Sequence, residues 1–275
     1  MTEPNTPQRH DTYTHGHHSS VLRSHSARTA QNSAAYLLGR LSPGARVLDV
    51  GCGPGSITLD FARLVAPGEV IGIERSMTAV ESAKSAALAA NIDNVSFAVG
   101  DVYELDFEGA SFDIVHAHQV LQHLSDPPAA LSEMQRVCKP GGVVAVRDAD
   151  YSAMSWYPQS PGLTRWLELY MQVARANGGE PDGGRHLLAW AHAAGLQAIE
   201  ASASVWCYAT ADERAEWGQT WAIRVTESEF AKQAVAAGFA DATELDALAQ
   251  AWREWSVHPD GWFTIPHGEL LCMVD

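Results

Sequence analysis

The chain has 275 residues, with 18 Lys and Arg against 33 Asp and Glu, and a formal net charge of −15. This acidic balance disfavours nucleic acid as a partner, because phosphate backbones bind basic surfaces. Apolar runs fall short of the roughly 18 to 20 residues of a membrane-spanning helix, and the polar N-terminus has no signal-peptide core. We therefore expect a cytoplasmic protein with no membrane partner. The cysteines, dispersed without a CxxC pair, predict neither disulfides nor a zinc site: Cys52, Cys138, Cys207 and Cys272.

The first half of the chain alternates between strand and helix patterns. It follows a polar segment over 1–12 and a helical pattern over 20–41. Helices are expected over 56–65, over 76–90 and from 126 onward, where Asp126 and Pro127 form a helix start. Strands separated by helices of this length indicate βαβ units and a parallel sheet. The expected strands are 47–50, 70–73, 95–99, 112–117 and 143–147.

The second half departs from this rhythm. Helical patterns cover 161–177 and 184–194, and strand-like alternation covers 198–208 and 262–274. Between those two strands lie about 50 mostly helical residues, a length that usually carries a function such as a lid. Composition does not tell whether its tryptophans pack a helical appendage, which is the commoner case, or line a pocket. These residues are Trp217, Trp221, Trp252 and Trp255.

Three glycines, Gly51, Gly53 and Gly55, separate the first strand from the first helix of the alternating region. Glycine permits a sharp turn and close approach of a ligand to main-chain amides, so a strand, a glycine turn and a helix start form a nucleotide-type binding edge. Glu74 ends the second strand, where a carboxylate can accept ribose hydroxyls. Asp101 ends the third, where it can accept an adenine amine. We expect these acids on one edge of the sheet.

Several motifs in order resemble those of class I S-adenosylmethionine-dependent methyltransferases, and within them the ubiquinone-biosynthesis-type branch that methylates small molecules. The resemblance is carried by VLDVGCGPG at 47–55, Glu74, GDV at 100–102, FDIV at 112–115 and KPGG at 139–142. It is strong over 45–147 and weak from Tyr151 onward.

The resemblance implies an α/β fold, a Rossmann-like, doubly wound, seven-stranded sheet whose last strand is antiparallel, with a mostly helical cap. Residues 1–41 would form an N-terminal lid and 42–150 the cofactor-binding core. The end of the sheet would follow in 151–275, with a substrate cap over 151–182 and 209–261.

The resemblance also implies S-adenosyl-L-methionine as the cofactor. The three glycines would line its methionine moiety, Glu74 its ribose, and Asp101 and Val102 its adenine. Arg28 could meet the cofactor carboxylate or be an ordinary exposed arginine. Asp49, inside an apolar strand, needs a partner and would order the glycine turn. The remaining cofactor-binding candidates are Tyr13, Arg75, Met77, His118 and Gln119.

Methyl transfer from a sulfonium requires mainly alignment and exclusion of water. A base is needed only if the nucleophile carries a proton that must leave, and the candidates are His118, Asp148 and Tyr13. The histidines cluster at 15–18 and 116–123 without the helical pairing or cysteine partners of metal sites, so we expect no metal. We expect His116 and His123 to be structural.

The aromatic content favours a small aromatic or heterocyclic acceptor, with an indole-containing natural product of secondary metabolism as the narrower hypothesis. The expected acceptor-pocket residues are Trp156, Tyr157, Trp206 and Trp221. Two alternatives stay open: a nicotinamide-dependent oxidoreductase, whose Gly-x-Gly-x-x-Gly spacing is missing here, and a non-catalytic cofactor-binding protein. The protein would be a monomer or a homodimer.

Overall fold

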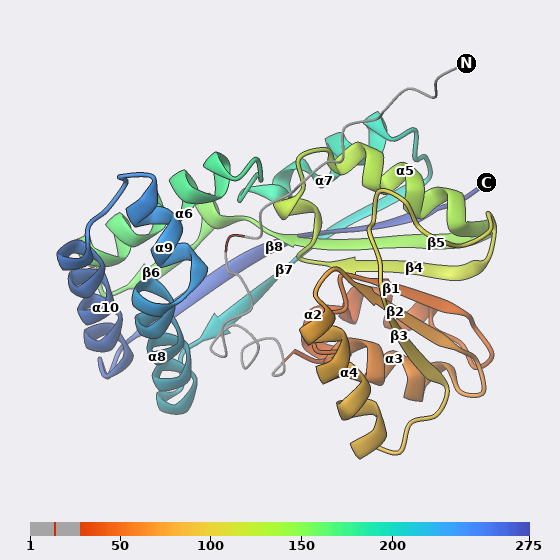
Figure 1. The fold of residues 1–275 in the computed structure, drawn as a ribbon, viewed down its shortest axis with the longest axis horizontal. Coiled ribbons are helices and arrows are strands. Elements are labelled where there is room, and N and C mark those ends of the chain that lie inside the picture. The colour runs from red at the N-terminus through yellow and green to blue at the C-terminus, as the bar shows by residue number, and fades with distance from the viewer. Residues whose placement is uncertain (1–13, 15–27) are drawn as a thin grey trace.

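The computed structural model describes Thr14 and residues 28–275. In this part of the chain eight strands form one sheet, in the order β3-β2-β1-β4-β5-β8-β6, and β7 also pairs with β8 (Figure 1). The strands are β1 Val47–Val50, β2 Val70–Glu74, β3 Val95–Val99, β4 Phe112–His118, β5 Cys138–Ala149, β6 Ser155–Tyr157, β7 Ile199–Tyr208 and β8 Trp262–Met273.

The pairing of the strands confirms the Rossmann-like prediction. β1 to β5 run parallel to one another, and β8 is antiparallel to β5. The sheet has one strand more than predicted, because the short β6 pairs with the end of β8 that extends past β5. β5 begins at Cys138 rather than at 143, with a register shift against β4 between Phe112 and Ile114.

Helices cover both faces of the sheet (Figure 1). α5 and α7 pack with one face, whereas α2, η1 and α3 pack with the other. The sheet-covering elements are α2 Ala30–Ser33, the 3-10 helix η1 Ala35–Arg40, α3 Ser56–Val65, α4 Met77–Ala89, α5 Pro127–Val137 and α7 Gly183–Ala193. Two further 3-10 turns are η2 Leu121–His123 and η3 Tyr151–Ala153.

The described part of the helix predicted over 20–41 is divided into a short helix and a 3-10 helix. Thr29 forms a capping box with Asn32, so a helix begins at Ala30. It ends after one turn at Ala34, whose backbone is no longer helical, and a 3-10 helix follows. The expected start of α5 is confirmed, since the Asp126 side chain accepts from the Ala129 amide.

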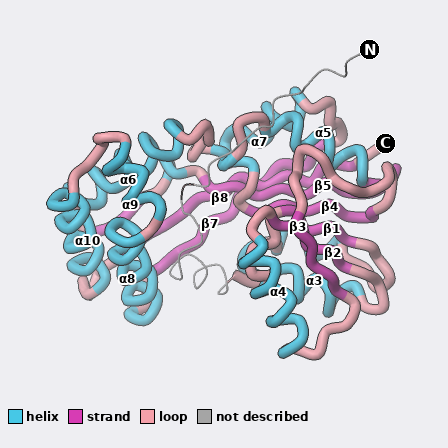
Figure 2. Tube along the Cα trace, in the orientation of Figure 1, coloured by secondary structure: helices cyan, strands magenta, loops and turns pink. Residues whose placement is uncertain are grey.

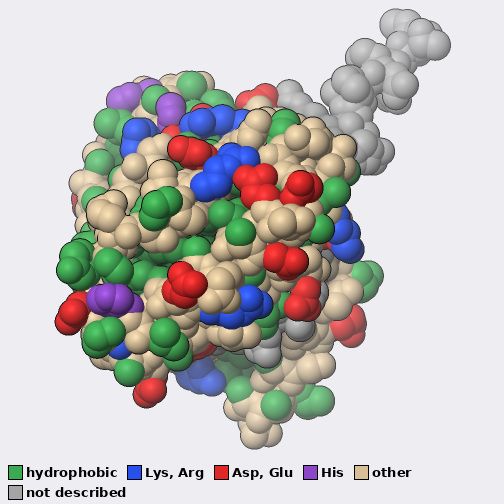
Figure 3. All heavy atoms as spheres, turned by 90° about the vertical axis from the view of Figure 1, so that its left-hand side faces the viewer, with side chains coloured by type: hydrophobic (Ala, Val, Ile, Leu, Met, Phe, Trp, Pro, Cys, Tyr) green, Lys and Arg blue, Asp and Glu red, His purple; other side chains and the backbone are tan. Residues whose placement is uncertain are grey.

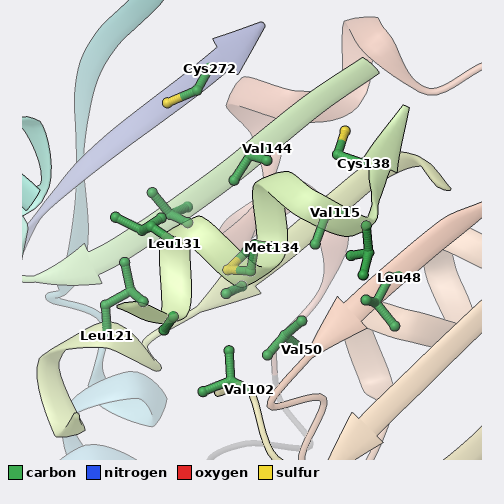
Figure 4. Packing of buried hydrophobic residues seen from close by; sticks show 14 of the residues in the cluster. Leu48, Val50, Val102, Val115, Leu121, Leu131, Met134, Cys138, Val144 and Cys272 are labelled. Atoms are coloured by element: carbon green, nitrogen blue, oxygen red, sulfur yellow. The ribbon is translucent and has the colours of Figure 1, made fainter. Parts of the chain in front are cut away.

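Side chains of β1 alternate between the two faces of the sheet. Leu48 and Val50 point towards α5, where they join Val115, Val144 and Met134 in a buried cluster (Figure 4). Val47 points the other way and packs with residues of α3. Helices cover both faces of a parallel sheet, so its strands are apolar on both sides, which explains the nearly continuous apolar pattern of β1.

A helical cap lies at one end of the sheet, where β7 and β8 extend beyond the other strands (Figures 1 and 2). Its helices are α6 Pro161–Ala176, α8 Ala211–Glu227, α9 Glu229–Ala236 and α10 Ala242–Ser256. The ring of Trp166 lies 4.5 Å from that of Trp221 and 4.8 Å from that of Trp252, centroid to centroid. These tryptophans thus form the aromatic core of the cap.

The outer face of the cap carries acidic and basic side chains intermingled with apolar ones (Figure 3). Within the described part of the chain, every helix is too short or too polar to span a membrane.

Candidate active site

The glycine turn joins β1 to α3 in a backbone conformation that other residues rarely adopt. The φ angles of Gly51, Gly53 and Gly55 are 66°, 54° and 86°. A Cβ on Gly51 would lie 2.4 Å from Val120 Cγ2, so both the conformation and the space require glycine there. Gly55 directly precedes α3, and a Cβ there would lie 3.0 Å from the Phe97 ring.

Asp49 anchors this turn from below. Its side chain is 3 % exposed, and its Oδ1 lies 2.7 Å from His116 Nδ1 on β4. Its Oδ2 accepts a hydrogen bond of 2.6 Å from the Thr58 hydroxyl on α3. The strand-interior acid therefore has the partners that burial demands, and it connects two strands and a helix beneath the glycines.

Glu74 connects the end of β2 to the same turn. Its Oε2 accepts from the Gly53 amide (3.3 Å), and its Oε1 accepts from the Ser76 amide (3.1 Å). The carboxylate thus lies beside the glycine turn, as sequence spacing predicted for two motifs at neighbouring strand ends.

A cavity of about 390 Å³ lies over the glycine turn and the end of β2. It extends to the loop after β4, where Val120, His123 and Leu124 close it. The structure brings together in its wall most of the expected cofactor-binding residues: Arg28, Asp49, Gly51, Gly53, Glu74, Arg75, Val102, His118 and Gln119.

Three expected cofactor-binding residues lie outside this wall, and a fourth, Tyr13, lies outside the described residues. Gly55 lies at the start of α3 and packs against Phe97. Met77 is 60 % exposed at the start of α4, so its side chain faces solvent rather than the cavity. Asp101 pairs with Glu104 in an isolated bridge, and its Oδ1 accepts from the Tyr103 amide (3.0 Å).

His118 ends β4 at the cavity wall and is 5 % exposed. Burial, reinforced by the charges of Arg28 and Arg147, holds the pKa of His118 well below its usual value. Neither ring nitrogen has a hydrogen-bond partner among the described residues. His118 is therefore neutral near pH 7 and has a nitrogen free to accept a proton.

Gln119 follows His118 in the left-handed region, with φ of 54°. Its Oε1 accepts from Arg28 Nη2 (2.6 Å), and its Nε2 lies 2.8 Å from His267 Nε2. The other nitrogen of His267 lies 2.9 Å from the Ile265 carbonyl, which only an N–H can satisfy. Gln119 consequently donates to His267, and the orientation of its amide is determined.

A second cavity of about 490 Å³ lies on the cap side of the first. Both cavities are lined by Arg28, Gln119 and His123, so they meet at these three residues. The second cavity has an aromatic wall from β7, α8 and η3, made of Tyr151, Trp206, Tyr208, Trp217 and Trp221.

Of the expected acceptor-pocket residues, Trp206 and Trp221 line the second cavity. Trp156 and Tyr157 line neither cavity: the Trp156 ring stacks on Phe263 at 5.8 Å, and Tyr157 is 55 % exposed. Sequence reasoning missed Tyr208. The period-two alternation of β7 could have found it, because residues 206 and 208 share a face of the strand.

Asp148, an expected base, lines neither cavity. It is fully buried behind the loop after β4, where its Oδ1 accepts from the Gln122 amide (3.1 Å). Burial raises the pKa of Asp148 to about 7. Burial likewise lowers the pKa of His123 to about 3. In the described residues no three His, Cys, Asp or Glu side chains come together in a way that could hold a metal ion.

A comparison with protein families complements this geometry. The model of the family described as "Methyltransferase domain" matches residues 41–219, which include the glycine turn, Glu74, His118 and Trp206. The chain belongs to this methyltransferase family. With its glycine turn and its Rossmann-like sheet, it is a class I S-adenosylmethionine-dependent methyltransferase.

Individual relatives agree with this assignment. An uncharacterized methyltransferase of Schizosaccharomyces pombe is 36 % identical over 267 residues, which cover 94 % of this chain and 95 % of the relative. The fold is similar to that of the YcgJ protein from Bacillus subtilis, with a TM-score of 0.56 at 20 % identity over 88 % of this chain and 97 % of that one.

A third similar protein is phosphoethanolamine N-methyltransferase 2 of Haemonchus contortus, solved with phosphomonomethylethanolamine and S-adenosylhomocysteine. Its TM-score is 0.55 at 20 % identity, over 88 % of this chain and 52 % of that one. The family assignment favours the methyltransferase prediction over both alternatives, an oxidoreductase and a non-catalytic binding protein.

Proposed function

We propose that this methyltransferase holds S-adenosylmethionine in the first cavity and methylates a small aromatic or heterocyclic acceptor in the second. The observation that carries the proposal is the meeting of the two cavities at Arg28, Gln119 and His123. Donor and acceptor bound on the two sides of this boundary would have their reacting atoms close together, which is the main requirement of an in-line displacement.

The residues of the first cavity suit this donor. Gly51 and Gly53 line the first cavity, and without side chains their main-chain groups can approach a ligand closely. The Glu74 carboxylate can accept from ribose hydroxyls while it keeps its bonds to the turn. Gly100 and Val102, after β3, line the part of the cavity where adenine would lie. Arg28 would meet the donor's carboxylate.

The second cavity suits a flat acceptor. Trp206 and Tyr208 from β7 line it together with Trp217 and Trp221 from α8, and aromatic rings bind planar acceptors favourably. The Tyr208 and Trp217 rings already stack at 4.4 Å between centroids. An indole-containing natural product of secondary metabolism is the narrower form of this proposal.

S-adenosylmethionine supplies an activated methyl group, so the protein has only to orient the acceptor, exclude water and remove a proton where one must leave. Gln119 and Arg28 would orient the reactants at the boundary of the cavities. His118 would accept the proton of a hydroxyl or ring N–H as the new bond to carbon forms. Its lowered pKa keeps it in the proton-accepting form at neutral pH.

The test measures transfer of labelled methyl groups to a panel of indoles, phenols and quinols, with aliphatic amines and acids as the contrast. We expect label only on the aromatic acceptors. Trp206→Phe, in the cavity wall, should raise the acceptor KM, whereas Trp262→Phe, 41 % exposed and outside both cavities, should not. Labelling of aliphatic acceptors alone would overturn the proposal.

A further inference from the structure

The wall of the second cavity holds an ion pair where β5, β7 and β8 lie side by side. Arg147 on β5 is in register with Glu269 on β8, and Glu269 is in register with Ser202 on β7. Arg147 and Glu269 are only 1 % and 5 % exposed, and Arg147 Nε lies 3.1 Å from Glu269 Oε1. Both residues line the cavity together with Ser204.

The hydrogen bonds of this ion pair leave one nitrogen of Arg147 without an acceptor among the described residues. Ser204 accepts from Arg147 Nε (3.1 Å) and Nη2 (3.0 Å). Glu269 Oε1 accepts from Arg147 and Ser204, and Glu269 Oε2 accepts from Ser202. Arg147 Nη1 is buried and has no partner among the described residues. A buried charged donor without an acceptor is unfavourable, so an occupant of the cavity that brings an oxygen would be stabilised.

The charges around the cavity favour an anion over a cation. Although the whole chain has a net charge of −15, the described residues that line this cavity include three arginines and two glutamates: Arg28, Arg147, Arg224, Glu213 and Glu269. Two arginines flank one aromatic wall, since the guanidinium carbons of Arg147 and Arg28 lie 4.9 Å and 5.5 Å from the Trp206 ring centroid.

The histidines near that wall add no negative charge, and the second glutamate of the cavity is exposed. His118 and His267 are neutral, because burial and the neighbouring arginines keep the pKa of each well below its usual value. Glu213 caps α8 at the exposed rim, where it accepts from the Ala209 and Thr210 amides. The inner wall therefore presents arginine donors next to uncharged rings.

We infer that the acceptor carries an anionic oxygen, which Arg147 binds through Nη1 while the rings of Trp206 and Tyr208 hold its aromatic part. This inference rests on the proposed function and defines its acceptor class more narrowly. An ammonium acceptor is disfavoured at the same place, because it would bring a further positive charge next to Arg28 and Arg147. Arg147 thus determines specificity rather than taking part in bond making.

The experiment compares 2-naphthoate with its uncharged isostere 2-naphthamide, as ligands of the protein saturated with S-adenosylhomocysteine, by titration calorimetry. We expect 2-naphthoate to bind at least about tenfold more tightly, since hydrogen bonds to charged groups are the stronger ones. Arg147→Met should remove this preference, and Arg147→Lys should retain part of it. Glu269→Gln, which removes the neutralising carboxylate, should increase it.

Arg165→Met serves as the matched control, because Arg165 pairs with Glu244 in the cap and lines neither cavity. It should leave the preference unchanged. Equal binding of the two probes to the unaltered protein, or a preference that survives Arg147→Met, would overturn the inference. Binding of S-adenosylhomocysteine is measured for every variant. If the unaltered protein does not bind S-adenosylhomocysteine, the proposed donor site is refuted. Failure of the donor site is therefore distinguishable from failure of the anion preference.

Discussion

Asp49 and His116 lie directly opposite each other on the neighbouring strands β1 and β4, with Asp49 Oδ1 2.7 Å from His116 Nδ1. Both are almost fully buried, and the Phe61 and His116 rings pack at right angles with 5.0 Å between centroids. The pair lies below the glycine turn, whose position depends on the end of β1. The acid inside this apolar strand therefore has its partners on β4 and α3, beneath the turn.

Asp49→Ala should lower the free energy of unfolding by roughly 2 to 4 kcal/mol, because it leaves a buried imidazole N–H and the Thr58 hydroxyl without their acceptor. Urea unfolding measures this. Glu81→Gln is the control: Glu81 and Lys84 form an exposed pair at 3.0 Å, whose loss should change stability by less than about 0.5 kcal/mol. Equal effects of the two substitutions would contradict the anchoring role.

Gly51→Ala should destabilise the protein by about 1 to 3 kcal/mol more than Gly141→Ala does. Both glycines have positive φ, 66° and 77°, but only a Cβ at Gly51 would collide, at 2.4 Å from Val120 Cγ2. At Gly141 the added Cβ would have no atom within 4 Å. Thermal unfolding compares the two variants. Similar losses would mean that Val120 moves aside and that the turn is less tightly packed than described.

His118→Asn should lower kcat by about 10² to 10⁴ for an acceptor that loses a proton, while donor affinity stays within a few fold. Because the pKa of His118 lies well below its usual 6.5, its ring is already deprotonated at pH 6.5. The kcat/KM of the unaltered enzyme should therefore not fall between pH 7.5 and 6.5 on account of this group. An acidic limb centred near 6.5 that disappears in His118→Asn would show that the ring is far better solvated than the structure indicates.

Local sequence signals predicted most of the fold. The alternation of apolar strands with capped helices located β1 to β4 and α3 to α5 within a few residues, and period-two alternation located β8, whose antiparallel direction the family resemblance implied. The short β6 was missed, because its three residues form a strand only through pairing with Trp262, Phe263 and Thr264, more than a hundred residues later. The helix expected over 20–41 was also predicted incompletely. Its described part begins at the Thr29 cap and ends at Ala34, where the chain packs against the core.

The site was predictable where its residues belong to local motifs, as for the glycine turn, Glu74 and His118. It was not predictable where partners are distant in sequence. Gln119 meets His267 from 148 positions away, and Arg147 meets Glu269 from 122. The sequence does not indicate that Arg147, inside a strand, is only 1 % exposed. Nor does it distinguish an exposed aromatic residue such as Tyr157 from one that lines a pocket.

Asp148 gives the clearest pH dependence of stability. Burial raises its pKa from the usual 3.8 to about 7, although Oδ1 accepts from the Gln122 amide. Between about pH 4 and pH 7 the unfolded chain has this carboxyl ionised whereas the folded protein keeps it protonated. The folded state then binds more protons, so this group makes stability fall as pH rises through that window and adds no further change above it.

Asp148→Asn removes this titration, while its amide oxygen can still accept from Gln122. The variant should therefore gain stability relative to the unaltered protein as pH rises from 4 to 7, by up to roughly 4 kcal/mol, and the gain should be constant above pH 7.5. Urea unfolding of both proteins at pH 4.5, 6, 7 and 8 measures the difference. A difference that shrinks with rising pH would mean that Asp148 is ionised in the folded state, and the loop after β4 would then be held by a charge rather than by a neutral acid.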